Sequence, residues 1–191
     1  MAETNLPPNR SRRAAARDEH VLQAARAVFA ADPGAPIAAV ARRAGVGMSA
    51  LYRRYASKDE LLGALCAQGQ EAYLAEARHA LASSASPADA YRDFLRRLVA
   101  GHPPLLAARL AGSFTLTERH RQNAAELSEL SEQLLARAQR DGGVRTDLTN
   151  DDIAAVLEAL GALRAGTEEA AVARRLRLLE VFLDGLTPVR P

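Results

Sequence analysis

The residues best equipped for chemistry lie between positions 42 and 58, where cationic, hydroxyl-bearing and apolar side chains recur at helical spacing. Arginine and lysine bind phosphates, serine and tyrosine hydroxyls bind phosphates or base edges, and methionine can touch a thymine methyl group. The expected contact residues are Arg42, Arg43, Gly47, Met48, Ser49, Tyr52, Arg53, Arg54 and Lys58. Together these residue types indicate binding to double-stranded DNA.

Two short helices separated by a turn would position these side chains. The apolar spacing predicts one helix over residues 37–44 and a second from residue 48 to 54 or 55, with Gly45 and Gly47 in the turn. The side chains expected to pack inward are Val40, Ala41, Val46, Leu51 and Tyr55. This is the layout of a helix-turn-helix over about residues 36–55, whose second helix enters the major groove. An ordinary helical hairpin with a polar surface is the alternative interpretation.

Helical periodicity continues through the rest of the chain, without sustained alternation of apolar and polar residues, so we predict an all-α fold with about nine helices. Residues 1–13 are expected to form a flexible basic arm. A capping box of Ser57 and Glu60 predicts a helix of about 25 residues that runs from Lys58 toward Ala82.

Later helix boundaries are marked by capping residues, prolines and glycines. Helices are expected to begin at Pro87, after Thr117, at a capping box of Thr149 and Asp152, and at Glu168, with ends at Gly101, Gly142, Gly166 and Gly185. A short apolar helix is expected over residues 105–110.

The segment AGVGMSALYRRYASKDELLGAL, residues 44–65, resembles the signature of the tetracycline-repressor (TetR) family of bacterial transcription regulators. The matching positions are Ala44, Gly45, Val46, Leu51, Tyr52, Tyr55, Ser57, Lys58 and Leu61. The resemblance implies an all-α protein with a DNA-binding domain over residues 14–64 and a ligand-binding and dimerisation domain over residues 65–191, joined by a long helix. It also implies that Lys58 binds a phosphate.

Two alanines depart from the family pattern. Ala50 stands where members often carry a hydroxyl group for a phosphate, and Ala38 stands where some members use a polar residue to reach a base. The first helix of the motif also begins near Pro36 without a side-chain cap, which costs about 1 kcal/mol relative to serine or threonine. We therefore expect base recognition to depend on fewer contacts, supported by Arg42 and Arg43 on phosphates.

The resemblance further implies that the last two long helices pair with those of a second subunit in a four-helix bundle. Residues 150–186 carry the apolar stripes that such a bundle requires. The expected interface residues are Ile153, Val156, Leu157, Leu160, Leu163, Leu176, Leu179, Phe182 and Leu183. The alternative is that these stripes only fill the core of a single chain.

A small-molecule effector is expected to bind among the middle helices, and the residues there favour an apolar or aromatic ligand. The candidate lining residues are Tyr73, Tyr91, Phe94, Leu98, His102, Leu106, Arg109, Leu110, Phe114 and Leu127. An ordinary core position is the alternative for the apolar candidates, and an exposed loop is the alternative for His102. The sequence leaves open whether His102 or Arg109 contacts a ligand.

Charge and composition narrow the function classes. Residues 1–66 hold ten Lys and Arg against six Asp and Glu, whereas residues 67–191 hold fifteen against seventeen, so the basic excess accompanies the motif. No apolar run approaches the ~20 residues that span a bilayer, so we expect no membrane association. The single cysteine, Cys66, cannot form an internal disulfide and the N-terminus is polar, which together favour a cytoplasmic protein.

These observations predict a homodimeric repressor that binds a palindromic DNA operator and is released by a small-molecule effector. The alternatives are a helical ligand-binding or interaction module with weak or lost DNA binding, and a small helical enzyme. The four histidines lack metal-ligand spacing and no glycine-rich phosphate loop follows a strand, so we expect neither catalysis nor a metal or cofactor.

Overall fold

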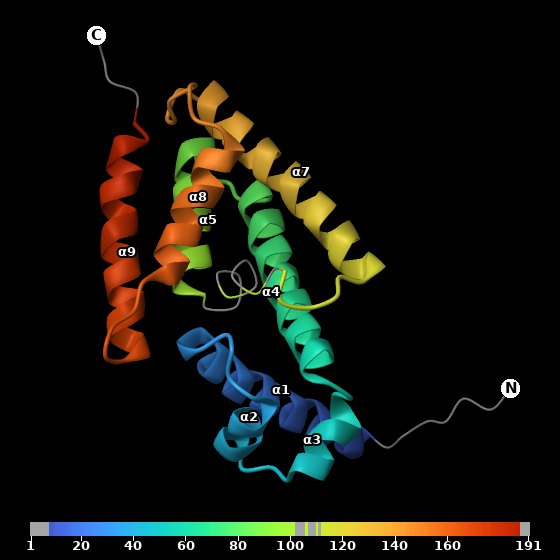
Figure 1. Cartoon of the computed structure of the whole chain (residues 1–191). Helices are drawn as coiled ribbons and strands as arrows, with labels where there is room; N and C mark the ends of the chain where they lie inside the picture. The colour runs from blue at the N-terminus through green and yellow to red at the C-terminus, as the bar shows by residue number, and fades with distance from the viewer. Residues whose placement is uncertain (1–7, 102–105, 107–109, 111, 188–191) are drawn as a thin grey trace, which may run out of the picture. The chain divides into compact units, whose positions relative to one another are not determined.

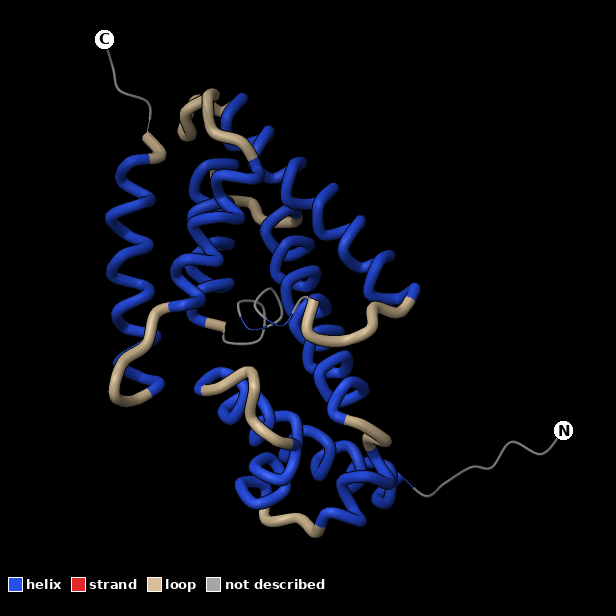
Figure 2. The backbone as a smooth tube through the Cα atoms, in the orientation of Figure 1, coloured by secondary structure: helices blue, strands red, loops and turns tan. Residues whose placement is uncertain are grey.

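All regular structure that the computed structural model describes is α-helical (Figure 1, Figure 2). The described residues are 8–101, 106, 110 and 112–187. Eight helices have defined bounds within them, against about nine expected, and the all-α prediction is confirmed. The short helix expected over residues 105–110 falls largely outside the described residues. The chain folds as two compact units, Met1–Leu65 and Cys66–Pro191.

The first unit contains three helices and the beginning of a fourth. Its first helix starts at Pro8, so residues 8–13 of the arm predicted to be flexible are helical, while residues 1–7 lie outside the described residues. Proline suits the first helical position, and the arginines and alanines that follow it have high helix propensity. The bounds are α1 Pro8–Ala31, α2 Ile37–Ala44, α3 Met48–Arg54 and α4 Lys58–Leu81.

The turn between α2 and α3 depends on Gly45, whose φ of 63° lies in the left-handed region that glycine adopts without strain. The Gly45 N–H donates to the Arg42 carbonyl at 3.3 Å and the Val46 N–H donates to the Ala41 carbonyl at 3.0 Å. These bonds satisfy the last carbonyls of α2. Gly47, with an ordinary φ of −69°, is the residue before α3. Both helices therefore have the bounds expected from the sequence.

The apolar core of the first unit fixes the rotation of α2 and α3 about their axes. Of the five side chains predicted to pack inward, four are buried and Val46 is half-buried. The larger buried side chains of this core are Val21, Leu22, Phe29, Ile37, Val40, Leu51, Tyr55, Leu61 and Leu62. Because Leu51 and Tyr55 are buried on one side of α3, its other side is turned to solvent.

The start of α4 is capped almost as the sequence predicts. The Ser57 hydroxyl accepts a hydrogen bond from the Glu60 N–H at 3.1 Å. The Glu60 carboxylate accepts from the N–H of Ala56 at 2.7 Å, one residue before the position that a capping box would use. The boundary between the two units, at Leu65 and Cys66, falls inside α4.

Four further helices with defined bounds build the second unit around the end of α4. Each begins with a hydroxyl side chain that accepts from a backbone N–H of the first turn, provided by Ser86, Thr117, Thr149 and Thr167. The capping box of Thr149 and Asp152 is present as predicted. The bounds are α5 Pro87–Ala100, α7 Glu118–Arg140, α8 Asn150–Ala162 and α9 Glu168–Gly185.

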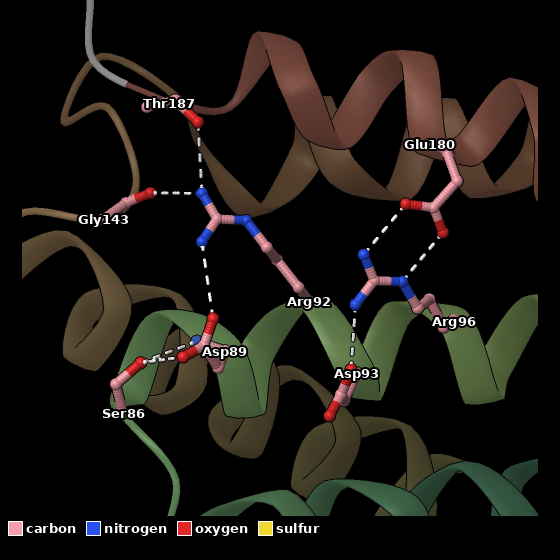
Figure 3. A network of polar contacts seen from close by, with 8 residues as sticks. All are labelled: Ser86, Asp89, Arg92, Asp93, Arg96, Gly143, Glu180 and Thr187. Carbon is pink, nitrogen blue, oxygen red and sulfur yellow. Dashed lines mark hydrogen bonds and ion pairs between the residues drawn. The ribbon is translucent and has the colours of Figure 1, made fainter.

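Apolar packing and a polar network together fasten α9 to α5. Leu179 and Leu183 are buried in the same core cluster as Phe94 of α5. At the surface, Arg96 of α5 donates two hydrogen bonds to the Glu180 carboxylate, at 2.8 and 2.9 Å, and a third to Asp93 at 2.9 Å (Figure 3). Bidentate pairing of this kind restricts geometry as well as adding energy.

A second group of polar contacts, around Arg92, joins α5 to the segments that follow α7 and α9. Arg92 of α5 donates to the Gly143 carbonyl at 3.0 Å and to the Thr187 hydroxyl at 3.2 Å (Figure 3). A single α5 side chain therefore holds the segment that follows α7 and the segment that follows α9.

The α8 helix ends four residues before the expected Gly166, at Ala162. Leu163 adopts an extended conformation with ψ of 137°. Its carbonyl accepts hydrogen bonds from Arg164 at 3.2 Å and from Arg175 of α9 at 3.1 Å. These two guanidinium groups take the carbonyls that a further helical turn would have used, which explains the early end.

Candidate nucleic-acid interface

The solvent-facing side of α3 carries the residues predicted to contact DNA. Met48 and Tyr52 are 36% and 47% exposed, which is high for large hydrophobic side chains, and Ser49 and Arg53 are exposed beside them. Positions 48, 49, 52 and 53 share one face because they repeat at spacings of three and four. Leu51, on the opposite face, is 1% exposed. The core thus presents a fixed face of α3 to solvent.

Two more cations extend this surface onto α2. Arg42 and Arg43 occupy the last turn of α2 and both are exposed. Cationic side chains there also interact favourably with the helix dipole. Gly47, between the two helices, is exposed, and the space where a side chain would stand holds no atom within 4 Å. Gly47 therefore leaves the start of α3 uncovered for close approach of another molecule.

Arg54 does not have the free guanidinium that its predicted phosphate contact requires. Its Nε donates to Oδ1 of Asp18 on α1 at 2.7 Å, and its Nη2 donates to Oδ2. The Tyr55 hydroxyl donates to the same Oδ1 at 2.7 Å. The Arg54 guanidinium also lies 5.7 Å from the centre of the Tyr55 ring. Arg54 therefore joins α3 to α1.

The electrostatics of this group agree with a stable ion pair. The Arg54 hydrogen bonds hold the pKa of the Asp18 carboxyl below its usual value, an effect that partial burial opposes and Tyr55 reinforces. The pKa of Arg54 is raised by the same contacts. Burial and the bond to Asp18 raise the pKa of Tyr55. At neutral pH the carboxylate is ionised and the guanidinium protonated, so the pair carries no net charge.

Lys58 is partly engaged within the first unit. Its ammonium donates to the Pro33 carbonyl at 3.2 Å and lies 5.2 Å from the centre of the Phe29 ring. An ammonium has three N–H donors, so this bond leaves two for another acceptor.

Helix α1 supports the motif from one side. In addition to the Asp18 contacts with α3, the His20 ring nitrogen Nε2 donates to the Ala44 carbonyl at the end of α2, at 3.2 Å. A cleft of about 790 Å³ lies beside these contacts, lined by α1 residues that include Asp18 and by Leu51 and Arg54 of α3. The ends of both short helices are thus anchored on α1.

Comparisons with known proteins agree with this architecture. The family model of bacterial regulatory proteins of the tetR family matches residues 21–65, and that of the C-terminal domain of SbtR-like transcriptional regulators matches residues 86–188. A TetR transcription regulatory protein from Mycobacterium vanbaalenii is 31% identical over 93% of this chain and 99% of its own, with a TM-score of 0.59. The chain belongs to the TetR family.

Two further solved structures show the same fold. A TetR transcriptional regulator from Streptomyces coelicolor is 28% identical over 91% of this chain and 99% of its own, with a TM-score of 0.59. The TetR-like regulator LfrR from Mycobacterium smegmatis, solved in complex with proflavine, is 22% identical over 86% of this chain and 94% of its own, with a TM-score of 0.59. No curated protein sequence matches the chain.

Family membership makes this chain a transcriptional regulator with a helix-turn-helix and not an enzyme. Within the part of the chain that the structure describes, no group of three or more His, Cys, Asp or Glu is placed to hold a metal ion. No helix among those residues is long and apolar enough to cross a membrane.

The residues predicted to line an effector pocket in this TetR-family regulator occupy different environments. Tyr91, Phe94 and Leu98 are at most 2% exposed and belong to the apolar core, which is the alternative that the sequence left open. Leu106, Leu110 and Phe114 are also buried, whereas Tyr73 and Leu127 are half-buried. His102 and Arg109 lie outside the described residues.

A group of polar contacts between α4 and α7 was not predicted from the sequence. Buried Gln70 of α4 donates to the His120 carbonyl at 3.1 Å and accepts from Asn123 at 3.3 Å. One turn further, the Tyr73 hydroxyl and the Ser131 hydroxyl lie 2.7 Å apart in a hydrogen bond. The signal in the sequence is the spacing: Gln70 falls four residues after Cys66 and four before Leu74, on the apolar stripe of its helix.

Five of the nine residues predicted at the dimer interface are buried within one chain, in agreement with the alternative that the apolar stripes fill its core. These are Ile153, Leu157, Leu160, Leu179 and Leu183. The remaining four, Val156, Leu163, Leu176 and Phe182, are half-buried and pack against the same core. On α9, Leu179 and Leu183 lie on the buried line of the helix, whereas Leu176 and Phe182 lie beside it.

The buried line of α9 repeats every four residues, at Ala171, Arg175, Leu179 and Leu183. Arg175 is 3% exposed and donates to the Glu168 carboxylate at 2.8 Å as well as to the Leu163 carbonyl. With this line facing inward, Leu178 and Val181 remain 43% and 68% exposed on the outer face of α9.

Proposed function

We propose that this TetR-family regulator is a homodimeric repressor that binds a palindromic DNA operator through α3 and leaves it when a small molecule binds the second unit. The observation that carries the DNA-binding part is the outward face of α3. Met48 and Tyr52 are exposed there beside a cation, Arg53, while Leu51 and Tyr55 fix the helix from the other side. A seven-residue helix fits a major groove about 12 Å wide.

Each exposed side chain has a proposed role on DNA. Met48 touches a thymine methyl group, and Ser49 and Tyr52 bind a base edge or a phosphate. Arg42 and Arg43, on α2, bind phosphates where that helix crosses the backbone.

Lys58 is proposed to bind a further phosphate with the N–H groups that Pro33 leaves available. Its hydrogen bond to the segment before α2 and its contact with Phe29 restrict the ammonium in advance. A restricted cation loses less conformational entropy on binding than a free surface lysine does.

The outer surface of α8 and α9 supports dimerisation. Leu178 and Val181 are exposed on α9, and three alanines are exposed on α8, at positions 154, 155 and 159. Small side chains permit two helices to approach closely, and exposed apolar groups gain free energy on burial. A two-fold symmetric pair would present two α3 helices, which accounts for a palindromic operator with half-sites spaced by whole helical turns.

Effector release is proposed through linkage between two conformations. A ligand that prefers the conformation in which the two α3 helices do not match the half-sites lowers operator affinity by its own binding preference. The LfrR regulator from Mycobacterium smegmatis was solved with proflavine, a planar aromatic compound. In the second unit of this chain the half-buried ring of Tyr73, which lies edge-on to buried Phe94 with the centroids 5.4 Å apart, is the aromatic group proposed to meet a ligand of similar character.

DNA binding is tested by selecting duplexes from a random-sequence library with the wild-type protein and measuring affinity by fluorescence anisotropy. We expect enrichment of a palindrome. Met48→Ala should weaken binding about tenfold and relax preference at one base pair, since it removes an apolar contact and burial contributes about 0.8 kcal/mol per methylene group. Leu116→Ala is the matched control, because Leu116 is 42% exposed in the second unit, before α7. Binding without sequence preference, or equal losses in both variants, would instead favour the interaction-module alternative.

Effector release is tested by a thermal-shift screen that starts with proflavine and other planar aromatic compounds. A compound that raises the melting temperature of the protein should also dissociate the selected duplex. If compounds that bind leave operator affinity unchanged, the proposed linkage is wrong.

A further inference from the structure

The two neighbouring arginines at the end of α3 are alike in type and exposure but not in their contacts. Arg54 is held by Asp18 through two hydrogen bonds. Arg53 is exposed and makes no hydrogen bond or ion pair with any other residue in the part of the chain that the structure describes. This difference bears on which arginine can bind DNA, and it rests on the DNA binding proposed above.

The Arg54 contact has the features of a positioning element. Asp18 lies 36 residues before Arg54 in the sequence, on a different helix. Its Oδ1 accepts from both Arg54 and Tyr55, and its Oδ2 accepts from Arg54. The Asp18 side chain is 21% exposed and the Tyr55 residue 4% exposed, so two of the three partners are embedded in the fold. The contact fixes the end of α3 against α1.

The same contact removes Arg54 from the electrostatic attraction for DNA. Binding of a cation to phosphate releases condensed counterions, and each neutralised phosphate contributes about 0.9 to the slope of log affinity against log salt concentration. An arginine already neutralised by a carboxylate releases none. Arg53 has no such partner among the described residues and retains its full charge for a phosphate.

We propose that Asp18 determines which α3 arginine binds the DNA backbone: it holds Arg54 as a positioning residue and leaves Arg53 as the phosphate-binding one. The Tyr55 hydroxyl supports Asp18 in that role. Two adjacent arginines therefore have different roles, and the residue that assigns these roles, Asp18, lies in α1.

The experiment measures binding to a mixed-sequence duplex, long enough for two half-sites, by fluorescence anisotropy over a series of KCl concentrations. Arg53→Ala should reduce the salt slope by about 0.9 per subunit. Arg54→Ala should leave the slope unchanged and lower affinity by a similar factor at every salt concentration, because the end of α3 loses its contact with α1. Circular dichroism confirms that each variant is folded.

Asp18→Asn provides the converse test, because it keeps the shape of the side chain and removes its charge. The released Arg54 should steepen the salt slope, by up to about 0.9 per subunit. In the Arg54→Ala background the same substitution should give no such increase, which separates release of Arg54 from a general change in net charge. Tyr55→Phe retains the ion pair and should leave the slope unchanged.

Two results overturn the inference while leaving DNA binding intact: an equal loss of slope in Arg53→Ala and Arg54→Ala, or an Asp18→Asn slope that does not depend on Arg54. Failure of the wild type to bind any duplex at low ionic strength is a different result. It refutes the proposed DNA binding itself, and with it the inference.

Discussion

Glutamate at both Leu178 and Val181 should separate a dimer of this regulator into monomers. The two side chains lie three residues apart on α9 and are 43% and 68% exposed. The other large hydrophobic side chains that are exposed among the described residues are Met48 and Tyr52 on α3 and Leu116 before α7. The double substitution therefore removes the apolar groups of α9 that a second chain would cover.

The size of the effect follows from the exposed fractions. Full burial of a leucine or valine side chain contributes about 1.5–3 kcal/mol. Scaled by 43% and 68%, the pair contributes roughly 2–3 kcal/mol per subunit, and a two-fold symmetric interface contains it twice. Loss of roughly 4–6 kcal/mol raises the dimer dissociation constant about a thousandfold or more. Burial of the new carboxylates would add to this loss.

Sedimentation velocity over a dilution series measures the dissociation constant directly. Leu116→Glu is the matched control, since Leu116 has nearly the same exposure as Leu178, at 42%, but precedes α7. The control should retain the wild-type association, and circular dichroism should show that both proteins are folded. A change of less than tenfold in the double variant, or equal dissociation of the control, would refute the assignment of this face.

Three further outcomes test the fold and its local electrostatics. Phe94→Ala should lower the free energy of unfolding by about 3–5 kcal/mol because the ring is buried, whereas half-buried Phe182→Ala should cost less; urea unfolding measures both, and equal losses would contradict the core assignment. The pKa of Asp18 is lowered in the folded state. The contribution of the ion pair to stability should therefore be complete when the pH is well above 3.8, the ordinary pKa, and should disappear as the pH falls through the lowered pKa. Asp18→Asn should therefore destabilise the protein at pH 7, and a stability difference that persists in strong acid would argue against the ion pair. Burial raises the pKa of the Cys66 thiol, so a disulfide reagent should modify it only after unfolding, and rapid reaction of the native protein would show that Cys66 is accessible.

The helix-turn-helix could be predicted from the sequence because its determinants are local. Glycine at position 45 permits the left-handed turn, and the spacing of Val40, Leu51 and Tyr55 identifies the inward faces. The outward face of α3 follows once the inward face is known. The bounds of α2 and α3 therefore agree with those expected.

In the later helices, local sequence signals predicted the starts but not every end. Their starts were predictable from Pro87, Thr117 and the Thr149–Asp152 box. The end of α8 was not, because Arg175 of the next helix binds the Leu163 carbonyl. A side chain on another helix thus contributes to the end of α8, together with Arg164 next to it.

The buried line of α9 was predicted only in part, because Leu179 and Leu183 lie on it but Leu176 and Phe182 lie beside it. An apolar stripe gives the period of a helix, but α9 has apolar residues on adjacent lines, so several rotations about the axis satisfy the pattern. Packing against α5 selected the line through Leu179 and Leu183, and placed a buried arginine on it. The exposed pair, Leu178 and Val181, follows from that rotation.

The amino-acid sequence by itself determined the all-α class, the family and the solvent-facing side of α3, because each is encoded in residues near one another in the chain. Only the tertiary structure decided that Arg54 binds Asp18 of α1 while Arg53 has no partner among the described residues. It also decided which face of α9 is exposed to a second chain. Those outcomes depend on partners far apart in sequence, such as Asp18 and Arg54, and on the rotation that core packing gives each helix. The local spacing of residues specifies neither the distant partners nor the rotation of a helix.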